Sequence, residues 1–385
     1  MTQPTFISNQ QTLEGAIAQL KTVKAFAIDL EFDKNHFRYG FQICLMQIFD
    51  GTNCYLIDPL SPRIDIKAIF GVLEDSSIQK VVFSFGEDMR LMHSLGCFPK
   101  NIVDTAVAAR LADYAPASLG NMLEAALDIE VNKSAQASDW FTRPLTPKQI
   151  EYAASDVLHL LKLQDLLAQK VEELGRTEWL NQENAAWDEL DYSDIDSNVY
   201  LKEKDKRNLS VYEWFVFGKL MDLREAEAQK LNRPSYKVLS KDYLLELAKR
   251  SNQIHRFDKI RGIHKKIKTP VFKQTLQKTL DKAIEKANQQ RLSQTEPATT
   301  RLSEEEYKKF IARKKLQDIA KKDVFKPIQE AMRADLGDNV ITLLINNRIM
   351  QDLAIGRTKD LLPYKIELIK KYATQLELDY TQYFQ

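Results

Sequence analysis

The sequence predicts an α/β domain with a mixed central sheet flanked by helices, followed by two small all-α domains. Three observations support this fold class. Short apolar runs bounded by turn residues, which are typical of buried strands, cluster in the first 85 residues. Helical spacing prevails from there to residue 187, and again from residue 209 onward. The 385 residues are enough for two or three separate cores.

Four strands are expected in the first domain. Each is an apolar run, and the first of them ends in acidic residues. The polar residues 51–53 provide a turn between the second and third runs. The four runs span 24–32, 41–49, 54–57 and 80–85.

Five helices are expected between and after these strands. The longest has a well-marked start, because Thr146 can cap it, Pro147 suits its first turn and Gln149 completes a capping box. The other segments with helical spacing span 64–73, 87–95, 105–113 and 119–127.

Two polar segments divide the chain into domains. Residues 188–208 change from acidic to basic and include few apolar side chains, so we expect a linker there. Residues 291–301 are polar and contain a proline, which indicates a second linker. The expected domains are 1–187, 209–290 and 302–385. Capping-box pairs mark both helical starts, Ser210 with Glu213 and Ser303 with Glu306.

The composition indicates a folded protein of a reducing compartment. Hydrophobic residues make up 44% of the chain and charged residues 28%, which excludes a disordered chain. The three cysteines form no CxxC pair, so neither a disulfide framework nor a thiolate zinc site is expected. The polar start of the chain does not resemble a signal peptide, and no apolar run reaches the roughly 18 residues that span a bilayer. We therefore expect a cytoplasmic protein with no membrane partner.

The charge is unevenly distributed along the chain. The formal net charge of +1 by itself argues against a nucleic-acid-binding protein. However, residues 1–200 carry 16 Lys and Arg against 29 Asp and Glu, a net charge of −13. Residues 201–385 carry 39 against 25, a net charge of +14. Either the two halves have different electrostatic tasks, or the difference arises by chance between solvated helix faces.

Acidic residues are the best candidates for chemistry, because other kinds of site are missing from the sequence. It contains no GxxxxGK[ST] phosphate loop, no GxGxxG after a strand and no HExxH pair, and its five histidines lack ligand spacing. We therefore expect no nucleotide cofactor.

The first candidates are Asp29 and Glu31, at the end of the first expected strand. Residues two apart in a strand point to the same face, so both carboxylates would project together from the edge of a buried sheet. Paired acids without a counter-charge are costly there, and hard divalent cations would relieve the cost. The same spacing recurs at Asp128 and Glu130, which we assign to a solvated loop.

Two further acids and a tyrosine complete the candidate site. Asp88 follows the fourth strand at a helix start, where the helix dipole also favours an acid. Asp156 lies on the long helix, and Tyr152 precedes it by one turn on the same face. The same spacing at Tyr192 and Asp196 falls in the expected linker. Each acid alone also fits an ordinary structural role, but the order and context of all four are more selective.

These residues resemble the motifs of the DEDD exonucleases, in the subgroup with a catalytic tyrosine, and most closely those of the ribonuclease D family. Residues 138–156 carry S-D-W, R-P-L and Y-A-x-x-D together, and 80–92 and 99–109 are similar to other stretches of that family. The sibling subgroup has a histidine one residue before the tyrosine, where Glu151 stands here. The resemblance implies a ribonuclease H-like 3′–5′ exonuclease domain.

The resemblance extends into the second half, with departures. Residues 220–250 and 260–263 resemble an HRDC domain, and 302–385 would be a second, diverged HRDC-like domain. Leu30 stands where ribonuclease D commonly has Thr, and 37–41 lacks the proline typical of that loop. Neither departure removes a metal ligand.

By this resemblance the catalytic tyrosine is Tyr152, and the metal-binding acids are Asp29, Glu31, Asp88 and Asp156. Two Mg²⁺ or Mn²⁺ ions would clamp the attacking and leaving oxygens of a phosphodiester. Asp29 would bridge both ions. Glu31 and Asp156 would hold the ion that activates water, and Asp88 the other. Tyr152 would orient the water or help to deprotonate it, while packing of its helix is the alternative role.

The implied reaction is hydrolysis of RNA from its 3′ end, which releases nucleoside 5′-monophosphates. The implied substrates are tRNA precursors or other structured RNA with a single-stranded 3′ end, and we expect a monomer. Phe32 resembles a residue that stacks on the terminal base, although a core position is equally consistent.

RNA binding would rest on phosphate neutralisation by the basic half. Its richest stretch contains Lys265, Lys266 and Lys268, for which a solvated helix surface is the alternative. A DNA exonuclease of the same chemistry and a non-catalytic nucleic-acid-binding scaffold are the alternative functions.

Overall fold

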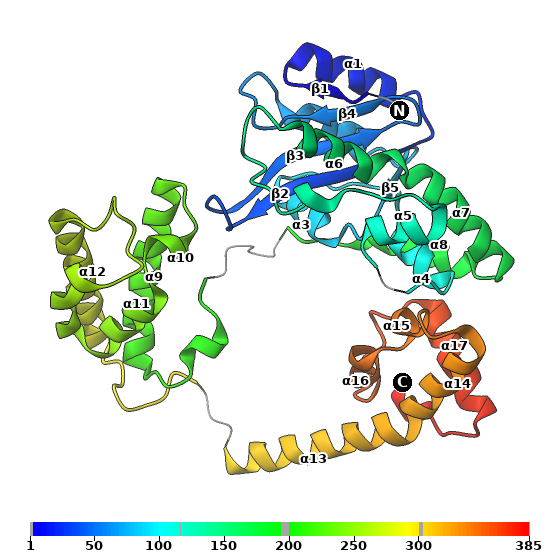
Figure 1. The fold of residues 1–385 in the computed structure, drawn as a ribbon. Coiled ribbons are helices and arrows are strands. Elements are labelled where there is room, and N and C mark those ends of the chain that lie inside the picture. Colours follow the sequence, from blue (N-terminus) through cyan, green and yellow to red (C-terminus); the bar gives the residue numbers. More distant parts are fainter. Residues whose placement is uncertain (1–2, 116, 194–199, 300–302, 385) are drawn as a thin grey trace. The chain divides into compact units, whose positions relative to one another are not determined.

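The structure is a computed structural model that describes residues 3–115, 117–193, 200–299 and 303–384 (Figure 1). The chain forms two compact units. Unit 1 comprises Met1–Glu31, Ile43–Asp194 and Glu306–Gln385, and unit 2 comprises Phe32–Gln42 and Ile195–Glu305. Among the described residues, no helix combines the length and the apolar character that crossing a membrane requires.

Unit 1 contains a six-stranded sheet in the order β1-β4-β3-β2-β5-β6. The four expected strands are confirmed as β2 (Ala25–Lys34), β3 (Phe41–Phe49), β4 (Cys54–Ile57) and β5 (Gln79–Val82). The sequence analysis missed the two edge strands, β1 (Thr5–Ile7) and β6 (Ile102–Asp104). At three residues each, they are too short to show a periodic pattern.

The sheet is mixed, as expected. β3 and β4 pair antiparallel and β1 pairs parallel to β4, whereas β2, β5 and β6 run parallel. The register places Ala27 opposite Val81 and Val82 opposite Asp104. The carboxyl ends of these three parallel strands therefore meet at one edge of the sheet, and the loops that follow them approach each other there.

Helices cover the sheet, as Figure 1 shows for α1, α6 and α7. The helix expected from Thr146 is confirmed as α6 (Pro147–Leu158), and both hydrogen bonds of its capping box are present. The other helices of this part are α1 (Gln10–Leu20), η1 (Ile66–Ile69), α2 (Phe70–Leu73), α3 (Gly86–Ser94), α4 (Thr105–Leu111), α5 (Leu119–Leu127), η2 (Lys133–Ala135), α7 (Leu160–Glu173), α8 (Thr177–Ala185) and η3 (Ala186–Glu189).

Unit 2 is a helical bundle with its own core. The capping box of Ser210 and Glu213 is confirmed at the start of α9 (Val211–Leu231). The core consists of buried apolar side chains such as Phe217 and Leu280, which are fully inaccessible. The other helices are η4 (Glu203–Lys206), α10 (Ser235–Val238), α11 (Lys241–Lys249), η5 (Ser251–Lys259) and α12 (Pro270–Gln289).

The N-terminal end of the segment expected as the first linker is hydrogen-bonded to unit 1. The backbone N–H of Asn101 donates to the Asp188 carboxylate at 3.0 Å, and the N–H of Tyr192 donates to Nδ1 of His93 at 3.0 Å. Asp196, the second member of the spurious Tyr–Asp pair, lies outside the described residues.

The chain ends in a series of further helices. They are α13 (Glu304–Ala320), the π-helix η6 (Lys321–Phe325), α14 (Lys326–Leu336), α15 (Ile341–Leu344), α16 (Asn347–Leu353), α17 (Pro363–Gln375) and η7 (Thr381–Tyr383). That 302–385 is a domain of its own stays a prediction. Its helices α15 and α17 contact α4 and α8.

Polar contacts of Arg176, Glu183 and Asp113 help to hold this C-terminal region to α4 and α8. The Arg176 guanidinium donates to the carbonyls of Leu111 (2.6 Å) and Leu336 (2.7 Å), and so joins the two parts. The Glu183 carboxylate pairs with Lys365 at 2.7 Å and accepts from the hydroxyl of Tyr364 at 2.5 Å. Because Glu183 and Lys365 are about nine-tenths buried, removal of one partner would leave an uncompensated charge.

The third contact involves Asp113, at the end of α4. Its carboxylate accepts from the backbone N–H groups of Asn339 (2.8 Å) and Val340 (3.3 Å). Gly337 allows this close approach, because it has a φ of +107° and a Cβ there would lie 2.3 Å from Asp113 Oδ2. Any other residue at position 337 would have to displace the carboxylate.

We expect Gly337→Ala to destabilise unit 1, because a Cβ adds backbone strain and breaks the contacts of Asp113. Strain of this kind costs roughly 1–3 kcal/mol, and a thermal melt of the full chain would show it as a lower Tm. The matched control is Gly15→Ala, in exposed helix α1 with nothing within 4 Å of its Cβ. That change should be neutral or stabilising by about 0.5–1 kcal/mol. An unchanged Tm for Gly337→Ala would contradict the interface described above.

Candidate active site

The candidate site lies where the carboxyl ends of the parallel strands meet. Asp29 and Glu31 are on β2, two residues apart and thus on one face. Each contributes a carboxylate oxygen that lies within 4.8 Å of the other and of an oxygen of Asp156. The structure therefore brings together three of the four acids expected from the sequence, from positions 127 residues apart at the extremes (Asp29 and Asp156).

Helix α6 supplies Asp156 and Tyr152. The two side chains are one turn apart on the same face, so the hydroxyl of Tyr152 lies near the Asp156 carboxylate and partly offsets the rise in the pKa of Asp156. Asp156 is only 8% exposed, whereas Tyr152 is half-buried against the core. The capping box at Thr146 sets the start of α6 and hence the position of both groups along the helix.

The fourth acid, Asp88, lies in the first turn of α3 and is 8% exposed. The turn before this helix contains Ser84 in the left-handed region at φ +59°, which is costly for a residue with a side chain. The buried Asp104 carboxylate stabilises that turn, since it accepts from the N–H of Ser84 at 2.8 Å. Asp104 thus fixes the direction in which α3 starts.

The crowding of the acids changes their proton affinity. Burial, followed by the charges of Asp88, Asp156 and Glu31, raises the pKa of Asp29 well above its usual value. Burial raises the pKa of Asp88 and of Asp156 to about 7, and burial with the charge of Asp156 raises that of Glu31. Burial and the nearby carboxylates also raise the pKa of Tyr152, which keeps its hydroxyl protonated.

The donor set fits hard divalent cations. Carboxylate oxygens are the ligands that such cations prefer, and Asp29, Glu31 and Asp156 present them within 4.8 Å of one another. In addition, Oδ1 of Asp88 is buried and has no hydrogen-bond partner among the described residues. A buried carboxylate oxygen without a partner is costly, so a cation at this edge would satisfy it.

Sequence reasoning missed the group that holds the loop before α6. The Arg143 guanidinium forms a bidentate ion pair with Asp58, at 3.0 Å from Nε and 2.7 Å from Nη2. It also donates to the carbonyls of Trp140 (2.8 Å) and Cys44 (2.7 Å), and so joins β3, the end of β4 and the loop. The ring of Trp140 lies 6.0 Å from that of Tyr152. The R-P-L motif contained Arg143, but nothing in the sequence pairs it with Asp58.

The other sequence-predicted site residues belong to unit 2. Phe32 packs edge-on against Phe41 at a ring distance of 5.3 Å. The side chains of Lys265, Lys266 and Lys268 are exposed on the segment before α12. A role of these four residues in substrate binding stays a prediction.

Two family models match the chain. The model of the 3′–5′ exonuclease domain matches residues 4–172, and the model of the HRDC domain matches residues 216–269. The carboxylate cluster lies within the first match and on the sheet that this domain provides. Fold and site therefore define a divalent-metal-dependent 3′–5′ exonuclease that carries an HRDC domain.

Curated relatives identify the family. The chain is 32% identical over 253 residues to the ribonuclease D of Desulfotalea psychrophila, an alignment that covers 64% of this chain and 67% of the relative. The chain belongs to the ribonuclease D family of 3′–5′ exoribonucleases. It is also 31% identical over 252 residues to the ribonuclease D of Zymomonas mobilis, which covers 63% of each protein. The matched part thus spans about two thirds of the length of these relatives.

A solved structure supports the same fold. The crystal structure of Escherichia coli RNase D, described as an exoribonuclease involved in structured RNA processing, matches with a TM-score of 0.65 and 22% identity. The match covers 97% of this chain and 99% of that one. The fold class expected from the sequence is therefore confirmed. The assignment of 302–385 as a second HRDC-like domain stays a prediction, because the HRDC model matches only 216–269.

We expect Asp156→Asn to stabilise the metal-free protein. Because burial raises the pKa of Asp156 from 3.8 to about 7, folding costs free energy wherever this carboxyl is ionised in the unfolded chain. The penalty grows as the pH rises from about 4 to about 7 and is complete above that. With chelator at pH 8, the substitution should raise the free energy of unfolding by roughly 1–3 kcal/mol, and the gain should shrink at pH 5.

The matched control is Asp165→Asn, the same change on the exposed face of α7, which should leave the free energy of unfolding unchanged at both pH values. Chemical denaturation at pH 5 and pH 8 measures both variants. A gain that is as large at pH 5 as at pH 8 would contradict the pKa of Asp156 that burial raises to about 7.

Proposed function

We propose that the protein removes nucleotides from the 3′ end of RNA and releases nucleoside 5′-monophosphates. The proposal rests on one observation: carboxylate oxygens of Asp29, Glu31 and Asp156 lie within 4.8 Å of one another. The charge of Asp88 also raises the pKa of Asp29. A scaffold that only binds nucleic acid has no need for such a cluster, because buried acids repel both one another and a polyanion.

The four acids would hold two divalent cations, Mg²⁺ or Mn²⁺. When bound, such ions stabilise the charge on the attacking and leaving oxygens of a phosphodiester. Asp29 would be shared by both cations, since the charges of Asp88, Asp156 and Glu31 all raise its pKa. Glu31 and Asp156 would serve on the side of the attacking water, and Asp88 on the side of the leaving oxygen.

Tyr152 would orient the attacking water. Its raised pKa keeps the hydroxyl protonated, so it acts as a hydrogen-bond donor and as an acceptor through its lone pairs. The Asp156 carboxylate lies one turn away from the hydroxyl, and the centroid of the Trp140 ring lies 6.0 Å from that of the tyrosine ring. A water held by this hydroxyl would be turned toward the terminal phosphodiester without a change in the protein.

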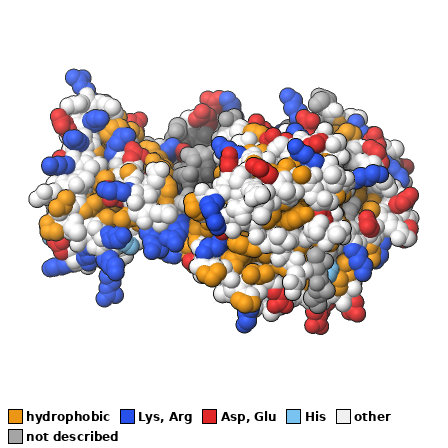
Figure 2. Space-filling model, turned by 90° about the horizontal axis from the view of Figure 1, so that it is seen from above, with side chains coloured by type: hydrophobic (Ala, Val, Ile, Leu, Met, Phe, Trp, Pro, Cys, Tyr) orange, Lys and Arg blue, Asp and Glu red, His pale blue; other side chains and the backbone are white. Residues whose placement is uncertain are grey.

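Unit 2 would supply the phosphate contacts. Residues 200–300 carry 23 Lys and Arg against 12 Asp and Glu, a net charge of +11, whereas 301–385 carry only +3 from 16 against 13. Figure 2 shows one face of unit 2 on its left side, and on this face Lys and Arg side chains predominate over acidic ones. This distribution suits a polyanion such as a tRNA precursor, whose backbone the exposed Lys265, Lys266 and Lys268 would contact.

The proposal is tested with RNA and DNA oligonucleotides of the same sequence that carry a label at the 3′ end. We expect rapid loss of the label from RNA with Mn²⁺ or Mg²⁺ and none with chelator. Asp29→Asn should abolish this loss. Asp128→Asn, the same change in the exposed copy of the D-x-E spacing, should not affect it. Equal cleavage of DNA would favour a DNA exonuclease, and no metal-dependent release from either substrate would overturn the proposal.

Tyr152→Phe should lower kcat by about 10²-fold or more, the usual range for loss of a positioned hydroxyl. KM should change little, because the ring and its packing on Trp140 remain. Steady-state kinetics with the labelled RNA measures both parameters, with Tyr307→Phe, at an exposed tyrosine of α13, as the control. A kcat within twofold of the wild type would leave Tyr152 only its packing role.

A further inference from the structure

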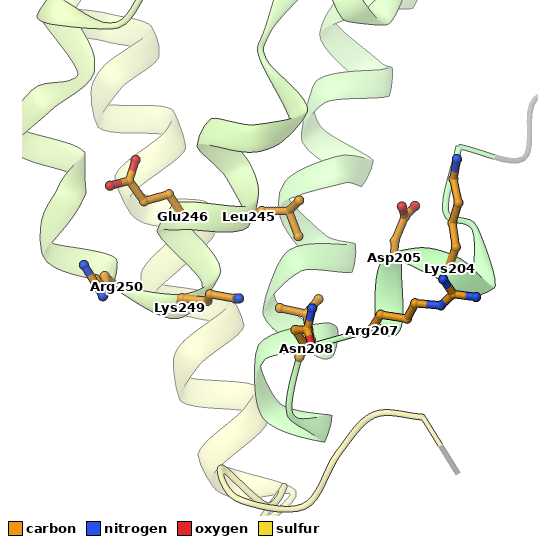
Figure 3. Close-up of a pocket in the computed structure, with 9 residues that line it drawn as sticks. Lys204, Asp205, Arg207, Asn208, Leu245, Glu246, Lys249 and Arg250 are labelled. Carbon is orange, nitrogen blue, oxygen red and sulfur yellow. The ribbon is translucent and has the colours of Figure 1, made fainter. Parts of the chain in front are cut away.

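We propose that a pocket in unit 2 binds the phosphate group of a nucleotide outside the active site. The pocket has a volume of about 490 Å³ and opens between η4 with its following turn and the end of α11 (Figure 3). Four cationic residues line it, and we call it the basic pocket: Lys204, Arg207, Lys249 and Arg250. The inference rests on the proposed function in one respect, since RNA and its mononucleotide products would be the source of the phosphate.

The positive charge of the basic pocket is not neutralised within the protein. Its two acids are already paired with cations from outside the lining, Asp205 with Lys241 at 2.5 Å and Glu246 with Arg256 at 3.2 Å. None of the four cations of the pocket forms an ion pair with another described residue. Four like charges gathered around one hollow repel each other, and an anion would relieve that repulsion.

The cations that line the pocket come from two separate segments. Lys249 and Arg250 lie at the end of α11, where the helix dipole alone favours positive charge. The helix dipole of α11 does not explain the positions of Lys204 and Arg207, because Lys204 belongs to η4 and Arg207 directly follows it. In Figure 3, Lys249 extends toward Asn208, while Lys204 and Arg207 lie on the η4 side of the pocket. Two helical segments thus place charge around the same hollow.

The rest of the lining fits a nucleotide better than a bare anion. Leu209, which is 3% exposed, and Leu245 provide an apolar surface between the charged groups. Asn208, held at φ +66° in the turn, carries an amide that can donate a hydrogen bond. A pocket of a few hundred Å³ with apolar walls and a few polar groups is typical of sites for small ligands. Here the apolar part would meet the nucleoside and the cations its phosphate.

The basic pocket differs from the contact predicted by sequence reasoning. Lys265, Lys266 and Lys268 are not among its lining residues. Residues 204–209 also precede the segment 216–269 that matches the HRDC model. The site is thus formed jointly by the HRDC domain and the segment that leads into it.

The test uses the full chain with chelator present, so that no probe is hydrolysed. The probes are 5′-AMP, measured by calorimetry, and a fluorescent single-stranded RNA, measured by anisotropy at several salt concentrations. The variants are Lys249→Gln with Arg207→Gln, and a second pair, Lys204→Gln with Arg250→Gln. The control pair, Lys278→Gln with Arg291→Gln, removes the same charges from exposed positions of unit 2 outside the pocket. A thermal melt verifies that all variants fold.

Each pocket pair should raise the Kd of a bound probe about tenfold and lower the salt slope for RNA by about 1, while the control pair stays within twofold. Loss of RNA binding alone assigns the pocket to a nucleotide within the chain, and loss of AMP binding alone assigns it to a free mononucleotide. A wild-type protein that binds neither probe, or pocket variants that bind both as the wild type does, would overturn the proposal.

A separate measurement distinguishes this inference from the proposed function. With Mn²⁺, the pocket variants should hydrolyse a trinucleotide at the wild-type rate, because so short a substrate needs only the active site. If the wild-type protein binds the probes but hydrolyses no substrate, the proposed exonuclease activity is refuted, while the proposed binding pocket is still supported. Loss of trinucleotide hydrolysis in the pocket variants would show that these residues serve the active site, and would overturn a separate pocket.

Discussion

The structure depends above all on the confinement of four carboxylates at one edge of the sheet. Burial raises the pKa of Asp29, Glu31, Asp88 and Asp156, and the charges of neighbouring site acids add to it at Asp29 and Glu31, so the fold carries a free-energy cost whenever they ionise together. Cations that these oxygens bind would remove that cost. The same arrangement that weakens the metal-free protein would, with cations bound, support the proposed phosphodiester chemistry at this edge.

Much of unit 1 serves to hold that edge together. Asp104 stabilises the left-handed turn at Ser84 and hence the start of α3, while Arg143 ties Asp58 to the loop before α6. The strand register brings the ends of β2 and β5 to the same level, so the acids of β2 and the start of α3, which follows β5 and carries Asp88, lie at the same edge. The C-terminal helices, fixed through Arg176 and the buried pair of Glu183 and Lys365, add support on the α4 and α8 side.

Negative and positive charge are concentrated in different parts of the chain. The acidic half contains the chemistry, and the positive charge is concentrated in residues 200–300 rather than spread over the whole second half. A near-neutral total therefore conceals two regions of opposite sign. Such a division lets a polyanion be attracted by one region while only its terminal phosphodiester meets the acids of the other.

The sequence by itself determined the long, periodic elements and the identity of the acids. β3, β4 and α5 have the bounds that their apolar patterns predict, and the capping boxes at Thr146 and Ser210 are local signals that need no partner. The D-x-E pair on β2 and the Tyr–Asp pair on α6 could also be recognised in the sequence, because strand and helix geometry set their spacing. Only the tertiary structure decided the edge strands β1 and β6, the pairing of Arg143 with Asp58, the role of Asp104, and the packing of the C-terminal helices on α4 and α8. Each of these joins residues far apart in the chain, and such contacts leave no local periodicity for a sequence pattern to reveal.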